Sequence, residues 1–226
     1  MSSLYQNGRA AAAVVQPPIS FGHKSPDFGR GPTKPLRAAV LRAVLAILGL
    51  ILVGGCRPSI ASEVAWRALR EGGAVVLIRH AQAPGTGDPP TFRLGDCSTQ
   101  RNLSSEGREQ AREIGAQFTT NHIPIERVVS SEWCRCLDTA RLAFGDRVEP
   151  LPALNSFFSS QDAEESQTRA IQVLVEGWRT HTGVLVLVTH QVNITALAGI
   201  YPTEGEVLVL KPGETSGFDL VVRFRP

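Results

Sequence analysis

The chain has 226 residues, of which 42% are hydrophobic and 19% charged, a composition typical of a globular protein with one domain and an appendage. Its formal net charge is only +2 at neutral pH, and the sequence holds no dense basic patch. These features argue against nucleic acid as a partner, and they indicate no particular acidic partner.

The N-terminal part of the sequence divides into two segments. Residues 1–35 show no sustained hydrophobic period, and their scattered glycines and prolines predict a disordered leader, or one that precedes the true start of the protein. Residues 36–56 begin with two arginines, continue with an apolar run over residues 43–53 and close with Gly54-Gly55-Cys56. A basic start, an apolar core and a small-residue end are the pattern of a secretory signal.

The end of this export segment leaves three interpretations open. Val53-Gly54-Gly55-Cys56 resembles a bacterial lipobox, in which the cysteine is lipidated and becomes the mature N-terminus. Ordinary cleavage after Ser59-Ile60-Ala61 is the second interpretation. A retained anchor is the third, although the apolar run is shorter than the roughly 20 residues of a spanning helix. We expect an exported protein, periplasmic or attached to the envelope membrane through a lipidated Cys56, with a folded domain over residues 57–226.

Helices and strands alternate along the predicted domain. We expect helices over residues 62–71 with Ser62 as the N-cap, from Ser104, over residues 136–144, from Ser160 or Asp162 through Trp178, and after His190. Strands are expected over residues 74–78, 127–131, 148–151, 184–188, 206–210 and 218–224. The segment 81–97 is rich in proline and glycine and is predicted to be a loop at the rim of a site. This pattern predicts an α/β fold, a three-layer α/β/α sandwich with a mostly parallel central sheet.

Two apolar runs that predict buried strands end in polar residues, the first in Arg79 and His80 and the second in His190. Ligands of open α/β sheets bind outside the carboxyl ends of the strands. A histidine at a strand end can act as a nucleophile, and an adjacent guanidinium can hold an oxyanion. Arg135 stands at the start of another predicted helix, where free backbone N–H groups favour an anion. Two histidines and two arginines together indicate the chemistry of a phosphoryl group.

Four blocks of the sequence carry a family resemblance. They are Arg79-His80-Ala81, the segment Arg101-Asn102-Leu103-Ser104 through Ala111, the segment Ser130-Ser131 through Arg135 to Thr139-Ala140, and Thr189-His190. In this order they resemble the histidine phosphatase superfamily, also called phosphoglycerate-mutase-like, whose first motif holds the histidine that becomes phosphorylated. Gln191 departs from the pattern, because glycine is usual at that position.

The resemblance implies a histidine-dependent phosphatase that hydrolyses a small phosphomonoester without a metal ion or another cofactor. His80 in its neutral form would attack phosphorus to give a phosphohistidine, which water would then hydrolyse. Arg79, Arg135 and His190 would stabilise the oxygens of the transferring group. Arg101 is a further candidate for a contact with the substrate.

The general acid is missing from the expected pattern. An alkoxide leaving group usually needs a proton from a positioned carboxylic acid. Many members of the family carry a glutamate in the segment that corresponds to residues 154–157, and this chain has none there, while Gln191 occupies the family's other acid position. Asp162, Glu164 and Glu165 lie just beyond and are candidates for the acid, although the acidic first turn of a helix would also explain them.

Two alternative functions remain open at this point. Phosphohistidine phosphatases of the same superfamily lack that glutamate, and the nitrogen of a phosphoramidate can leave already protonated. Export argues against this alternative, because an exported enzyme would not meet cytoplasmic phosphohistidine proteins. The second alternative is a module that binds a phosphate ligand without turnover.

The cysteines predict a disulfide near the site. If Cys56 belongs to the export segment, Cys97, Cys134 and Cys136 remain in the domain. We predict that Cys97 pairs with Cys134 or Cys136, tying the loop after the first strand to the segment that carries the arginine. Three buried thiols are the alternative, and a metal site is poorly supported because no second cysteine pair has a ligand-like spacing.

Overall fold

The computed structural model describes residues 22 and 60–226; the export segment, Cys56 and the predicted leader apart from residue 22 lie outside these residues. In this described part of the chain, no helix combines the length and the apolar character that crossing a membrane requires.

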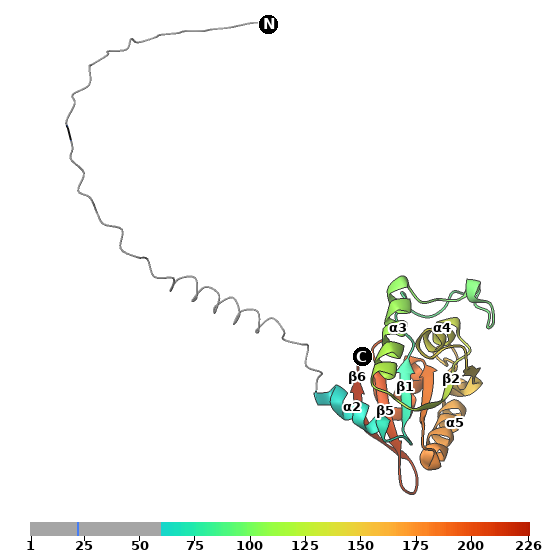
Figure 1. The fold of residues 1–226 in the computed structure, drawn as a ribbon. Coiled ribbons are helices and arrows are strands. Elements are labelled where there is room, and N and C mark those ends of the chain that lie inside the picture. Colours follow the sequence, from blue (N-terminus) through green and yellow to red (C-terminus); the bar gives the residue numbers. More distant parts are fainter. Residues whose placement is uncertain (1–21, 23–59) are drawn as a thin grey trace. The chain divides into compact units, whose positions relative to one another are not determined.

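The fold is a six-stranded sheet with helices on both faces (Figure 1). Its main elements are α2 (Ile60–Arg70), β1 (Val75–Arg79), α3 (Ser105–Thr120), β2 (Ile125–Ser130), α4 (Cys134–Phe144), β3 (Val148–Pro150), α5 (Glu164–Gly177), β4 (Val184–Thr189), α6 (Gln191–Ala198), β5 (Val207–Pro212) and β6 (Phe218–Phe224). Short 3-10 helices lie at η1 (Cys97–Thr99), η2 (Pro152–Leu154), η3 (Gln161–Ala163) and η4 (Trp178–Thr180). The strand order is β3-β2-β4-β1-β5-β6; the first four strands are parallel, and β5 and β6 are antiparallel to their neighbours. The predicted fold class is confirmed.

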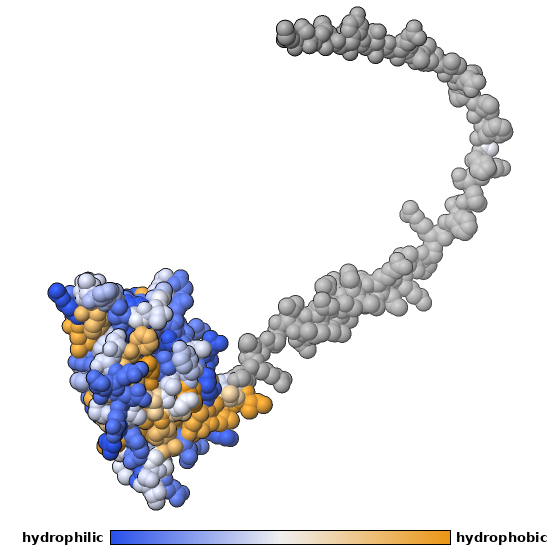
Figure 2. Space-filling view, turned by 180° about the vertical axis from the view of Figure 1, so that it is seen from behind, coloured by the Kyte–Doolittle hydropathy of each residue, from blue (hydrophilic) through white to orange (hydrophobic). Residues whose placement is uncertain are grey.

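The strands of the sheet divide the core into two layers, because successive side chains of a strand point to opposite faces. In β1, Val76 and Ile78 pack in the cluster that includes residues of α2, α3 and α4. Val75 and Leu77 pack in the cluster that includes residues of α5 and α6. The surface in Figure 2 is mostly hydrophilic with smaller apolar patches, as expected when the apolar faces of strands and helices are buried.

Two helix starts differ from the sequence expectation. The helix α2 already contains Ser62, so this residue lies within the helix and is not its cap. The helix α5 begins at Glu164, directly after η3, and neither Ser160 nor Asp162 caps it through a side-chain hydrogen bond. A tight 3-10 turn has taken the place of the first turn expected from the sequence.

The helix starts nearest to the strand ends follow local chemistry more closely. Ser104 is the N-cap of α3, as predicted, and its hydroxyl accepts a hydrogen bond from the N–H of Gly107. Gly107 lies so close to the carbonyl of Gln82 that an added Cβ would overlap it, so the glycine lets α3 approach the end of β1. The helix α4 begins at Cys134, earlier than predicted, which places Arg135 in its first turn.

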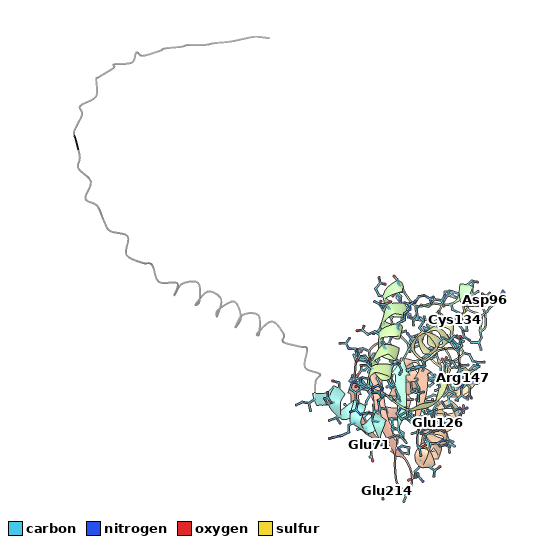
Figure 3. The ribbon with its side chains drawn as sticks, viewed as in Figure 1. Glu71, Asp96, Glu126, Cys134, Arg147 and Glu214 are labelled. Carbon is cyan, nitrogen blue, oxygen red and sulfur yellow. A yellow bond between two sulfur atoms is a disulfide. The ribbon has the colours of Figure 1, made fainter. Side chains whose placement is uncertain are left out.

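A disulfide joins Cys97 to Cys134, and Cys136 is a free, buried thiol. This confirms the predicted tie between the loop after β1 and the start of α4, with Cys134 as the partner of Cys97. Figure 3 shows Asp96, the neighbour of Cys97 in the sequence, beside Cys134. The bond therefore anchors the far end of the loop that follows β1.

Removal of this disulfide is expected to lower the free energy of unfolding by roughly 3 to 4 kcal/mol, the chain-entropy value for a loop of this length. The two cysteines lie 37 positions apart in the sequence. Urea unfolding of the oxidised protein and of the Cys97→Ser/Cys134→Ser double variant would measure the difference. A reducing agent should shift the wild-type midpoint and leave that of the double variant unchanged; equal midpoints for both proteins would contradict the prediction.

Candidate active site

The carboxyl ends of the parallel strands bring both predicted histidines together. Arg79 of β1 pairs in register with Thr189 of β4, so the residues that follow, His80 and His190, leave neighbouring strands side by side. Their rings are buried and their centroids lie 5.6 Å apart. One cavity of about 510 Å³ is lined by all five residues that the sequence assigns to nucleophilic or anion-binding roles: His80, His190, Arg79, Arg101 and Arg135.

The protonation state of His80 follows from its hydrogen bond and its burial. Its Nδ1 lies 2.8 Å from the carbonyl oxygen of Ala81, and because a carbonyl can only accept, Nδ1 carries the hydrogen. Nε2 therefore keeps its lone pair. Burial lowers the pKa of His80 to about 3, aided by the charges of Arg135, Arg101 and Arg79 and opposed by the hydrogen bond to Ala81. His80 is thus a neutral imidazole with a free ring nitrogen at neutral pH, the form that a nucleophile requires.

The second histidine, His190, is fixed from two sides. Its Nε2 lies 2.8 Å from the hydroxyl of Ser131, and its Nδ1 lies 3.5 Å from a terminal nitrogen of Arg135. The Ser131 hydroxyl lies in turn 3.2 Å from the side-chain oxygen of Asn155. Burial is the main cause that holds the pKa of His190 well below its usual value, followed by the positive charge that a protonated His80 would add. Both ring systems are therefore neutral at neutral pH.

These two lowered pKa values predict that the protein loses stability in mild acid. Between pH 6.5 and the pKa of about 3 in the folded state, the unfolded chain binds a proton at His80 that the folded protein does not bind. The contribution of these histidines to the free energy of unfolding is therefore constant above about pH 6.5. As the pH decreases below about 6.5, the free energy of unfolding decreases by about 1.4 kcal/mol per pH unit for each such histidine. Urea unfolding at about pH 7.5, 6.5 and 5.5 would measure the slope. A His80→Asn/His190→Asn double variant should show a flatter profile, and an equally steep profile would refute this assignment.

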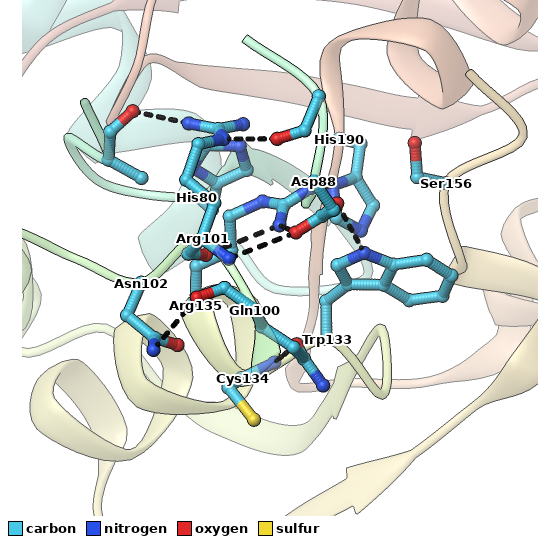
Figure 4. Close-up of polar contacts among 12 residues, drawn as sticks. His80, Asp88, Gln100, Arg101, Asn102, Trp133, Cys134, Arg135, Ser156 and His190 are labelled. Carbon is cyan, nitrogen blue, oxygen red and sulfur yellow. Dashed lines mark hydrogen bonds and ion pairs between the residues drawn. The ribbon is translucent and has the colours of Figure 1, made fainter. Parts of the chain in front are cut away.

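Arg135, which is buried, and Asp88, which is partly buried, form an ion pair at the centre of the site (Figure 4). The two terminal nitrogens of Arg135 donate to the two carboxylate oxygens of Asp88, at 2.8 and 3.2 Å. Asp88 also accepts from the backbone N–H of Arg101 at 3.1 Å and from the indole N–H of Trp133 at 3.0 Å. All four donors hold one carboxylate, which fixes the orientation of the Arg135 guanidinium.

The other two arginines bind backbone carbonyls at the rim of the site. Arg79 donates to the carbonyl of Pro202 at 2.9 Å, and Arg101 donates to the carbonyls of Gly87, at 2.8 Å, and Ala83. The carboxylate of Glu204 lies 3.7 Å from Arg79 and 3.9 Å from Arg101. Arg101 therefore holds the loop after β1 as well as lining the cavity.

Two buried donors in this cluster lack a partner. The Nε atoms of Arg79 and Arg135 are buried and make no hydrogen bond within the described residues. Buried polar groups in folded proteins are nearly always satisfied, so such donors indicate the place of an anionic ligand. Both belong to residues that the sequence assigned to anion binding.

The three acidic residues proposed as the general acid do not reach this site. Asp162, Glu164 and Glu165 line a different cavity, over η3 and α5, and none of them lines the cavity with the histidines. Residues 156–160 still border the histidine cavity through serine and phenylalanine side chains, and the chain then turns away into η3. The structure thus corrects this part of the sequence interpretation.

Sequence reasoning missed Asp88, Trp133 and Gln100. Asp88 stands in a glycine- and proline-rich loop, where an aspartate is an ordinary turn residue, so nothing in the local sequence marks its role. Gln100 accepts a hydrogen bond from the N–H of Cys134 at 2.9 Å and thereby holds the start of α4. The one available signal was position, because Gln100 adjoins Arg101 and Trp133 lies within the block that ends at Thr139-Ala140.

The site places two neutral histidines beside an arginine cluster at the carboxyl edge of the sheet of an α/β protein. Residues 75–158 match the family model described as the histidine phosphatase superfamily, branch 1. Over these residues the chain is similar to this superfamily. A comparison with curated proteins found no match.

Solved structures share the fold at low sequence identity. The protein histidine phosphatase SixA in complex with tungstate is 17% identical, with a TM-score of 0.50, over 68% of this chain and 97% of that chain. A phosphoserine phosphatase from Entamoeba histolytica in complex with phosphoserine is 13% identical, with a TM-score of 0.50, over 66% and 95% of the two chains. The ecdysone phosphate phosphatase from Bombix mori in complex with tungstate is 11% identical, with a TM-score of 0.50, over 65% and 91%.

Proposed function

We propose that the protein is a phosphatase that hydrolyses a small phosphorylated substrate through a phosphohistidine on His80. The observation that carries this proposal is the neutral His80, with Nε2 unprotonated, in one cavity with Arg79 and Arg135, whose buried Nε donors lack partners. The match of residues 75–158 to the histidine phosphatase family model and the phosphatase structures that share the fold support the reaction class.

In the proposed reaction, Nε2 of His80 forms a bond to phosphorus while the bond between phosphorus and the leaving atom breaks. Charge on the three equatorial oxygens of the transferring group would be stabilised by the guanidinium groups of Arg79 and Arg135. His190 borders the same cavity and is available as a further hydrogen-bonding group. Water would then attack the phosphohistidine, releasing phosphate and regenerating His80.

We propose further that the reaction needs no metal ion, because the arginines supply the positive charge that a metal ion would otherwise bring. Within residues 22 and 60–226, no group of three or more His, Cys, Asp or Glu side chains has an arrangement that could hold a metal ion. Activity measured with and without EDTA tests this point directly.

A phosphohistidine side chain is the second candidate substrate. It is favoured by one observation, the lack of a carboxylic acid free to protonate an alkoxide in the histidine cavity of the described chain, since Asp88 is held by four donors. A module that binds phosphate without turnover is the third candidate, and the assay below separates it from an enzyme.

We also propose that the protein is exported and reaches the periplasm or the envelope membrane. The disulfide between Cys97 and Cys134 supports this, because disulfides persist in oxidising compartments. Cell fractionation with mass spectrometry of the mature N-terminus would decide among lipidated Cys56, cleavage after Ala61 and a retained anchor. Recovery of the uncleaved chain in the cytoplasm would overturn the proposal.

The test of function is the release of phosphate from p-nitrophenyl phosphate by the purified protein, with EDTA present. Continuous turnover is the expected result. Activity that EDTA abolishes and a divalent cation restores would overturn metal independence. A folded protein that binds phosphate, turns over no phosphorylated compound and gives no labelled histidine would overturn the phosphatase and establish the binding module.

A further inference from the structure

Beyond the histidines and arginines, the cavity is lined by four aromatic side chains and by residues that are uncharged apart from Asp88. Phe92 stacks on Trp133 with ring centroids 4.9 Å apart and an interplanar angle of 21°. Phe158 and Tyr201, which are 56% and 70% exposed, line the same cavity and leave ring surface open to solvent. The other lining residues outside the charged cluster are small, hydroxyl-bearing or otherwise uncharged. Such walls suit a planar, uncharged group better than a second anion.

The cavity also lacks a ready proton donor. Asp88 is the single carboxylate among the described residues that line it, and four hydrogen-bond donors surround its two oxygens. Burial alone would raise the pKa of Asp88, but the hydrogen bond and charge of Arg135, with the bonds from Trp133 and the Arg101 backbone, hold it below its usual value. A carboxylate in this state stays ionised, and protonation would require it to give up one of these donors.

The remaining charged and titratable groups of the cavity do not fill this role. His80 and His190 are neutral at neutral pH because burial lowers the pKa of each, and both lie in the reacting cluster. The three arginines do not give up protons in proteins. Glu204, the nearest other carboxylate to the arginines, accepts from the backbone N–H of Ala83 and does not line the cavity. Tyr201 remains, a largely exposed hydroxyl-bearing residue of the cavity wall.

We infer that the substrate carries its phosphoryl group on a planar, uncharged ring system that leaves without a proton from the enzyme. This inference rests on the phosphatase function proposed above. Two kinds of substrate carry a phosphoryl group on such a ring: an aryl phosphate such as phosphotyrosine, and the phosphoimidazole of phosphohistidine.

The reaction balances for both kinds of leaving group. The new bond joins His80 Nε2 to phosphorus, and the electron pair of the broken bond stays on the leaving atom. A phenolate delocalises this pair into its ring, and an imidazole protonated by solvent beforehand leaves neutral. An alkoxide from serine or glycerol has neither route and needs the acid that the cavity lacks.

The experiment compares kcat/KM of the full chain for several phosphorylated compounds at neutral pH. The ring-bearing substrates are p-nitrophenyl phosphate, phosphotyrosine and phosphohistidine; the alkyl substrates are phosphoserine and glycerol 3-phosphate. We expect the alkyl substrates to be about 100-fold slower or worse, the cost of a missing general acid. Comparable rates on phosphoserine and phosphotyrosine would overturn the inference while leaving the phosphatase intact. No turnover of any of these compounds by the folded protein would instead refute the proposed function itself.

Acetyl phosphate separates the need for a proton from recognition of a ring, because its leaving group departs readily but is not aromatic. Phe158→Ala should raise KM for phosphotyrosine about five- to tenfold, the value of a lost aromatic contact, and should not raise it for acetyl phosphate. Val173→Ala on α5, an exposed apolar position outside this cavity, is the matched control. An equal rise in KM for both substrates would overturn the ring-binding part.

Tyr201→Phe tests the phenolic hydroxyl on the cavity wall. The ratio of aryl to alkyl activity should be the same in this variant as in the wild type. A selective loss of alkyl phosphate turnover would identify Tyr201 as the acid and overturn the inference. Of the two ring sources, the one with the higher kcat/KM, phosphotyrosine or phosphohistidine, identifies the substrate class.

Discussion

The His80→Ala variant is expected to lose phosphoryl transfer, with kcat falling about 10,000-fold or more, because removal of a nucleophile eliminates the covalent route entirely. The structure gives the physical reason. His80 carries its hydrogen on Nδ1, which donates to the carbonyl of Ala81, so its Nε2 is unprotonated and lies in the cavity with the arginines. Rapid mixing with labelled substrate followed by a quench should trap an acid-labile phosphohistidine in the wild type and none in the variant.

The control for this experiment is His181→Ala. His181 is exposed, stacks on Trp178 with ring centroids 3.7 Å apart and bonds to Glu126, outside the histidine cavity. Its removal should leave kcat within about twofold, as for substitutions remote from an active site. If His80→Ala kept its activity while His181→Ala lost it, the assignment of the nucleophile would be refuted.

The positions of both histidines could be predicted from the sequence because a buried strand is recorded in local composition. Continuous apolar runs mark β1 and β4, and the structure buries nearly every residue of both strands. The residue directly after such a strand must emerge at the edge of the sheet, which is where His80 and His190 lie. The order of the strands adds what the sequence could not show, that β1 and β4 are neighbours.

The contact between Asp88 and Arg135 could not be predicted in this way. The two residues are 47 positions apart, and the path of the loop between β1 and α3 decides whether they meet. That path depends on the bonds from Arg101 to loop carbonyls and on the disulfide at Cys97, which are themselves long-range features. A glycine- and proline-rich loop carries no periodic signal from which such a path could be read.

The acidic candidates fail for a related reason. Asp162 and Glu164 lie close in sequence to the position of the family glutamate, but this does not determine where their side chains point. The chain turns at η3, and both residues line another cavity. The arginine-bound Asp88 then remains as the cavity's carboxylate in the described chain, and its contacts hold the Arg135 guanidinium in one orientation. Buried ion pairs of this kind depend on both members, because removing one leaves a charge without compensation.

Replacement of Arg135 is therefore expected to have the second largest effect. In Arg135→Ala, Asp88 would lose two of its four donors, and the proposed phosphoryl site would lose a guanidinium that lines the cavity. Loss of one such electrostatic contact costs about 100- to 1,000-fold in kcat, and the uncompensated carboxylate should also lower the free energy of unfolding by about 3 kcal/mol. Steady-state kinetics and urea unfolding on the same preparation would measure both effects.

Arg135→Lys separates charge from geometry at this position. Lysine keeps the positive charge but cannot reproduce two parallel hydrogen bonds to one carboxylate, so kcat should lie between that of Arg135→Ala and that of the wild type. The matched control is Arg127→Lys, because Arg127 also makes a two-nitrogen contact with a carboxylate, Glu149, at a more exposed place on the sheet. That substitution should change neither kcat nor stability measurably, since exposed ion pairs contribute little. Full activity in Arg135→Lys would show that the positive charge alone suffices, and that the guanidinium orientation fixed by Asp88 is not needed for catalysis.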